Sequence, residues 1–117
     1  MSHFYYLFIF LLMSCSGEIN IKSQEVIKVT IYAIGNDLNE IFYLELADKN
    51  AIKKLIKAIN NSQREPIKVL AKYKLELVGL NSTQIIFVAG DIIKLNGISY
   101  RSKINLNSEI ENLVNNI

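Results

Sequence analysis

Few side chains in this sequence could take part in covalent or acid–base chemistry. The chain has one cysteine, Cys15, and one histidine, His3. The carboxylates Glu45, Glu76 and Asp91 fall on expected strands or a turn, with no spacing that pairs them for acid–base work. Neither S-x-x-K nor G-x-S-x-G occurs, so two known settings of a nucleophilic serine are missing. We therefore expect a protein that is not an enzyme, with no catalytic residue, no metal site and no cofactor.

The chemistry open to Cys15 is set by the residues before it. Residues 4–13 read FYYLFIFLLM, which is too short to cross about 30 Å of hydrocarbon as a helix and suits the apolar region of a signal peptide. Leu12-Met13-Ser14-Cys15 resembles the lipobox of bacterial lipoproteins, with an aliphatic residue three positions before the cysteine and a small residue immediately before it. The resemblance covers only this export segment.

The lipobox resemblance implies that residues 1–14 are a lipoprotein signal peptide and that Cys15 becomes the lipidated N-terminus. In that family the cysteine carries a diacylglycerol thioether and often a third acyl chain, and two or more chains hold a protein on a bilayer. We therefore expect a membrane-anchored protein of the cell envelope. Ser16 resembles the outer-membrane pattern if the cell is Gram-negative. An uncleaved signal anchor, or a chance cysteine after a secretory signal, is the alternative.

Length and composition indicate one small folded domain. The 117 residues are 50% hydrophobic and 21% charged, with a net charge of +2, so a packed core is expected. With a pI near 8.6 and an exported address, we expect no nucleic-acid partner. We expect a lipidated cysteine and flexible tether over residues 15–25, followed by a single domain over residues 26–117.

The polarity pattern predicts strands at residues 26–34 and 41–46, joined as a hairpin, with Phe42 facing inward beside Leu44 and Leu46. Asp48 can cap a helix that buries four apolar residues at helical spacing. These residues are Ile52, Leu55, Ile56 and Ile59. Lys53, Lys54 and Lys57 lie on the other side, where they either face solvent or meet anionic lipid headgroups.

The second half of the chain predicts four more strands and a helix. Strands are expected at residues 67–78 and 84–89, with a turn at Gly90-Asp91, and residues 92–101 form a hairpin about Asn96-Gly97. A two-residue loop there pairs Leu95 with Ile98 and Ile93 with Tyr100 on one face, and Lys94 with Ser99 on the other. A capping box of Ser108 and Glu111 would begin a C-terminal helix. The apolar face of that helix is Ile110, Leu113, Val114 and Ile117.

The expected fold is α+β: an antiparallel sheet in the order β-β-α-β-β-β-β-α with the helices packed on it. The run α-β-β-β-β-α resembles the topology of the TATA-binding-protein-like fold, and the chain has a general similarity to small lipoproteins of unknown function from AT-rich bacteria. Topology alone carries no function.

The sheet face opposite the helices is predicted to be more apolar than a solvated face. Its apolar residues are expected to be Tyr32, Tyr43, Leu70, Val78, Ile86 and Val88. We take Tyr32, Tyr43, Leu70, Lys72 and Lys74 as the candidate partner surface. Coverage of this face by the C-terminal helix or by a second copy of the chain is the alternative.

These patterns favour a lipid-anchored, non-catalytic envelope protein that binds an envelope protein partner. An inhibitor or immunity lipoprotein against a toxin or hydrolase is a more specific form of that hypothesis. The alternative is a carrier that holds a small apolar or lipid ligand between helix and sheet. A pocket lined by Phe42, Tyr73 and Phe87 would favour the carrier.

Overall fold

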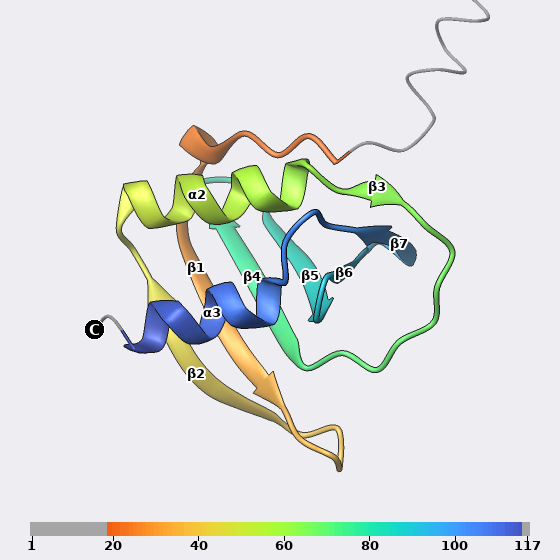
Figure 1. The fold of residues 1–117 in the computed structure, drawn as a ribbon. Coiled ribbons are helices and arrows are strands. Elements are labelled where there is room, and N and C mark those ends of the chain that lie inside the picture. The colour runs from red at the N-terminus through yellow and green to blue at the C-terminus, as the bar shows by residue number, and fades with distance from the viewer. Residues whose placement is uncertain (1–18, 116–117) are drawn as a thin grey trace, which may run out of the picture.

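The computed structural model describes residues 19–115, in which helices and strands follow the order expected from sequence (Figure 1). The predictions for residues 1–14, Cys15 and Ile117 concern positions outside the described residues. The elements are η1 (Ser23–Glu25), β1 (Val26–Ile34), β2 (Glu40–Leu46), α2 (Lys49–Asn60), β3 (Gln63–Arg64), β4 (Tyr73–Gly79), β5 (Thr83–Ala89), β6 (Ile92–Leu95), β7 (Ile98–Arg101) and α3 (Leu106–Asn115).

The strands form one antiparallel sheet in the order β2-β1-β4-β5-β6-β7-β3. Both helices lie against the same face, in front of β1, β4 and β5 in Figure 1. The predicted α+β class is therefore confirmed, with the two-residue strand β3 added at the edge beside β7. The core lies between the helices and the sheet, where Ile31, Leu75 and Ile56 are at most 1% exposed.

The β6–β7 hairpin forms as its turn residues predict. Asn96 and Gly97 both have positive φ, 52° and 81°, as a type I′ turn requires. Leu95 pairs with Ile98 and Lys94 with Ser99, which is the predicted register. Local turn chemistry and the polarity pattern specify the same pairing, so the prediction is confirmed.

Replacing Gly97 with valine should lower the free energy of unfolding by about 1 to 3 kcal/mol, the range for a residue held in a disfavoured backbone region. A Cβ at this position would have no heavy atom within 4 Å, so the loss comes from backbone strain alone. Chemical denaturation of the variant measures it. Asn96→Gly is the matched control and should keep the wild-type midpoint; an unchanged midpoint in Gly97→Val would contradict the turn.

The first helix begins and packs as predicted, whereas the second begins earlier. The Asp48 side chain accepts a hydrogen bond from the Ala51 amide at 3.2 Å. In α3, the amide of Ser108 donates to Asn105 Oδ1 at 3.1 Å. Asn105 therefore caps α3, and the predicted Ser108–Glu111 capping box is wrong. Starting at Leu106 allows that fully buried side chain to join the core.

Residues 19–25 pack on the domain, so the predicted flexible tether is wrong for this part of the chain. Ile19 and Ile21 are 5% and 9% exposed and belong to the core. The Ile21 amide donates to Asn60 Oδ1, and Asn60 Nδ2 donates back to the Ile21 carbonyl, both at 2.8 Å. Isolated isoleucines in a polar stretch gave no periodic signal, yet each fills a place beside α2.

Candidate interaction surface

A row of side chains crosses the sheet face that the helices leave uncovered. Successive pairs along the row are cross-strand neighbours on β2, β1, β4, β5 and β6, so their side chains point to the same face. We call this set the open-face row: Phe42, Tyr32, Lys74, Phe87 and Lys94. Two aromatic residues begin the row, and from Tyr32 onward aromatic and lysine side chains alternate. This arrangement suits cation–π contacts.

The β2–β1–β4 end of the row is held by direct contacts. The Phe42 and Tyr32 rings meet edge to face with centroids 6.3 Å apart. Lys74 Nζ lies 5.3 Å from the Tyr32 ring centroid, and it donates to Glu40 Oε1 at 2.9 Å. That hydrogen bond raises the pKa of Lys74, while desolvation and then Glu76 raise the pKa of Tyr32. Lys74 stays charged and Tyr32 neutral at physiological pH, so their contact persists.

A β-bulge moves Tyr43 off this face, which corrects one predicted site residue. Ile31 pairs with Leu44 and Tyr32 with Phe42, so Tyr43 is the extra residue between them. Its ring lies 5.5 Å from the ring of Tyr73 on the helix-covered face. Phe42, predicted to face inward, is instead 58% exposed. Two residues have therefore exchanged faces.

Ile86 and Val88 were also expected on the uncovered face, and both are fully buried on the other. β5 is apolar from Ile85 to Ala89, so its own pattern cannot say which side faces inward. Pairing with β4 decides it, because Leu75 lies opposite Ile86 on the core face. Ile85 and Phe87 take the uncovered face, with Ile85 42% exposed.

Leu70 and Lys72 lie outside β4, because the strand begins at Tyr73 and not at residue 67. After β3 pairs with β7 at one edge, the chain must return to β4 in the middle of the sheet. Residues 65–72 make that crossing, and Leu70 is 80% exposed. Lys72 still joins the sheet through its backbone, donating to the Val88 carbonyl at 2.7 Å and accepting from the Ile34 amide at 2.9 Å.

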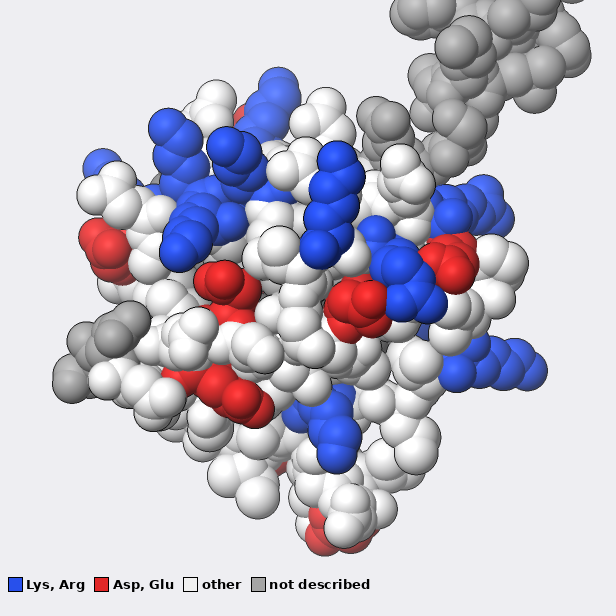
Figure 2. Space-filling model, in the orientation of Figure 1, with Lys and Arg blue, Asp and Glu red and all other residues white. Residues whose placement is uncertain are grey.

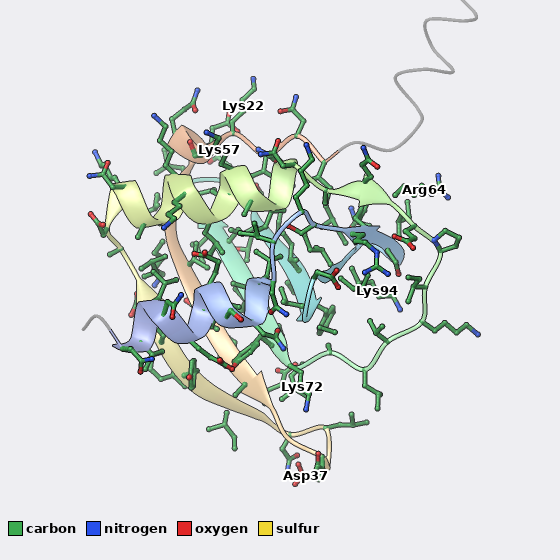
Figure 3. The ribbon with its side chains drawn as sticks, viewed as in Figure 1. Lys22, Asp37, Lys57, Arg64, Lys72 and Lys94 are labelled. Carbon is green, nitrogen blue, oxygen red and sulfur yellow. The ribbon has the colours of Figure 1, made fainter. Side chains whose placement is uncertain are left out.

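An open hollow of about 520 Å³ lies between this crossing segment and the uncovered face. Val69 and Ala71 form one side, and Ile85, Phe87 and Lys94 form another. A second hollow of about 530 Å³ adjoins it, sharing Val69 and Lys94 and adding Arg64 and Lys68. In Figure 3 the labelled Lys94 lies within the arc that this segment makes between β3 and β4. The uncovered face therefore carries an apolar hollow with a cationic rim.

The carboxylates singled out from sequence all pair with cations. Glu45 lies 3.3 Å from Lys28, and Glu76 lies 3.8 Å from Lys74. Asp91 accepts from Arg101 Nη1 at 2.7 Å, and hydrogen bonds to Glu65 and then Asp91 raise the pKa of Arg101. No cluster of three or more His, Cys, Asp or Glu suited to a metal ion occurs within residues 19–115.

Tyr73, Phe42 and Phe87 do not line a common pocket. Tyr73 lies on the helix-covered face, where its hydroxyl donates to Glu111 at 3.4 Å. Burial raises the pKa of Tyr73 to about 12, with Tyr43 and Glu111 adding to the shift, so the hydroxyl remains a donor. Phe42 and Phe87 lie on the other face. The three aromatics expected around a carrier pocket are thus separated by the sheet.

Of the predicted partner surface, Tyr32 and Lys74 share the uncovered face, and Phe42, Phe87 and Lys94 were missed. Phe87 could have been found from the Gly90-Asp91 turn. A two-residue loop there pairs Val88 with Ile93, and Ile93 was already assigned to the face of Tyr100. That would have placed Val88 in the core and Phe87 outside.

Within the described part of the chain, no helix is long and apolar enough to span a membrane. Comparison with protein-family models, with curated proteins and with solved structures finds no match for this chain.

Proposed function

We propose that this protein is a lipid-anchored, non-catalytic component of the cell envelope that binds a protein partner through the uncovered face of its sheet. The observation that carries the proposal is the open-face row, where aromatic and cationic side chains are left without a covering helix. The anchor is supported by the lipobox at residues 12–15.

The charges on this face indicate what kind of partner it suits. Lys28, Lys74 and Arg101 are all in ion pairs with carboxylates of the same chain. A partner therefore gains little from these charges and most from burying the Phe42 ring and Ile85. We propose a partner that presents an apolar surface, with acidic groups confined to the side near Lys94. A toxin or hydrolase with such a surface would make this an inhibitor or immunity lipoprotein.

Photocrosslinking in intact cells tests the proposal. A photoreactive amino acid at position 42 should yield a discrete crosslinked species, because that side chain projects from the uncovered face. The same group at Leu80, which is 86% exposed at the β4–β5 turn, is the control and should yield none. Equal crosslinking from both positions would mean that the uncovered face is not the contact.

The hollow beside Lys94 favours a second candidate function, a carrier of a small apolar ligand. Its volume of about 520 Å³ lies in the range of small-molecule sites. Ala71→Trp should fill it and abolish binding of an apolar fluorescent probe, whereas Ala58→Trp on α2 should not. Probe binding that survives Ala71→Trp would exclude the hollow as the carrier site.

A further inference from the structure

Lysines gather on the side of α2 along which residues 19–25 run. Lys49, Lys53 and Lys57 are spaced i, i+4 and i+8, so they form one exposed stripe. Lys22 extends it from the neighbouring segment, and Figure 3 shows Lys22 and Lys57 on the same side of the molecule. We call these four residues the lysine face.

Helix α2 with its flanking residues carries a larger positive charge than the net charge of the whole chain. Residues 48–61 contain four lysines and one aspartate, a balance of +3 against +2 for the protein. Figure 2 shows several blue side chains over α2 and the segment before β1 with few red ones among them, while most of the red side chains lie lower or to the right. Glu25 ends η1 and Asp48 caps α2, while Glu109 of α3 approaches Lys54 at 4.0 Å.

The path of the chain brings the lysine face next to the anchor point. Asn60, in the last turn of α2, binds Ile21 through two hydrogen bonds, and η1 lies beside the first turn, where Ser23 and Lys49 border one hollow. Residues 19–25 therefore run along α2 from its C-terminal to its N-terminal end (Figure 1). From Cys15 to the buried Ile19 the chain can reach about 14 Å at most.

We infer that the lysine face docks on anionic lipid headgroups, which holds α2 against the bilayer and leaves the uncovered sheet face free for a partner. The inference rests on the proposed lipid anchor at Cys15, which keeps the domain within this short reach of the surface. Each lysine near an anionic surface favours the docked orientation about fivefold. Losing three should therefore weaken docking roughly 100-fold.

Fluorescence quenching tests the orientation on the full lipidated chain reconstituted in vesicles. A fluorescent non-natural amino acid replaces Asn61, beside the lysine face, or Asn36 in the β1–β2 loop, whose neighbour Asp37 lies at the opposite end in Figure 3. The vesicles carry a nitroxide on the headgroup and contain phosphatidylglycerol or only phosphatidylcholine. Position 61 should be quenched in the anionic vesicles and position 36 should not, and 0.5 M salt should reduce the difference.

The variant K49Q/K53Q/K57Q should lose quenching at position 61. The matched control K68Q/K72Q/K94Q removes the same charge elsewhere and should keep it. Quenching that is absent in anionic vesicles, or equal in both vesicle types and in the triple variant, would overturn the inference. If the lysine face instead binds an acidic protein, position 61 should not be quenched in anionic vesicles. A crosslinked species should then form in cells and be lost in K49Q/K53Q/K57Q.

Anchoring is scored separately, by labelling Cys15 with a fatty-acid analogue. An unlabelled Cys15 would contradict the proposed anchor. A labelled Cys15 without quenching at position 61 would overturn the docking inference alone and leave the anchor standing.

Discussion

Ile86→Asp should unfold the domain, whereas Ile85→Asp should leave it folded. The two residues are neighbours on β5, yet Ile86 is 0% exposed in the core and Ile85 is 42% exposed on the uncovered face. Losing the isoleucine contacts costs about 2 to 5 kcal/mol and burying an unpaired carboxylate costs several kcal/mol more, so the sum is comparable to the whole stability of a small domain. A small domain is stable by only about 5 to 15 kcal/mol.

Circular dichroism during heating gives the melting temperature of each variant. We expect the melting temperature of Ile85→Asp to lie within a few degrees of the wild-type value. Ile86→Asp should already be unfolded before heating and should show no cooperative transition. The opposite ranking would mean that β5 presents its other side to the helices. That result would also remove Phe87 from the open-face row.

Cys15→Ser should abolish lipidation and block removal of the signal peptide. Cys15 is the only thiol in the chain, and the apolar stretch at residues 4–13 is too short to serve as a stable span. Labelling with a fatty-acid analogue should therefore give no signal in the variant. Because the variant keeps residues 1–14, its polypeptide mass should exceed the mass of the processed polypeptide, counted without the attached lipid. Ser14→Ala keeps a small residue before the cysteine and should be labelled like wild type. Equal labelling of wild type and Cys15→Ser would exclude the lipoprotein hypothesis.

The parts of the fold that local chemistry determines could be predicted from sequence. Asn96 and Gly97 specify a two-residue turn, and Asp48 specifies where α2 begins, because each acts on backbone groups within a few residues. The element order follows from those signals and from polarity period. Both were correct.

The predictions of strand face, strand start and helix cap were wrong where contacts between residues distant in sequence determine the structure. The bulge at Tyr43 shifts the phase of β2 halfway along the strand, and the alternation of residues 41–46 gives no sign of it. Residues 67–72 alternate like a strand, but most of them pair with no neighbouring strand. They cross from β3, which pairs with β7 at the far edge, back to β4. Asn105 replaces Ser108 as the cap since Leu106 must reach the core.

The wrong face assignments also explain which residues of the candidate surface were missed. Tyr32 and Lys74 were found because their strands alternate cleanly. Phe42 and Phe87 were missed because a bulge and an all-apolar strand hide which side they face. Lys94 was assigned to the correct face, but nothing in sequence brings residues 65–72 beside it to form the hollow.

Crosslinking in intact cells that express the double variant Phe42→Ser/Ile85→Ser tests whether the uncovered sheet face binds a protein partner. Both side chains are exposed, so each change should alter the free energy of unfolding by only about 0.5 kcal/mol, which a melt of the purified protein checks. The control is Leu80→Ser/Ile104→Ser, which removes two exposed apolar side chains outside the open-face row. We predict that the control keeps the crosslinked species and that the double variant, still folded, loses it. A folded double variant that retains every crosslink would exclude the uncovered sheet face as the partner site.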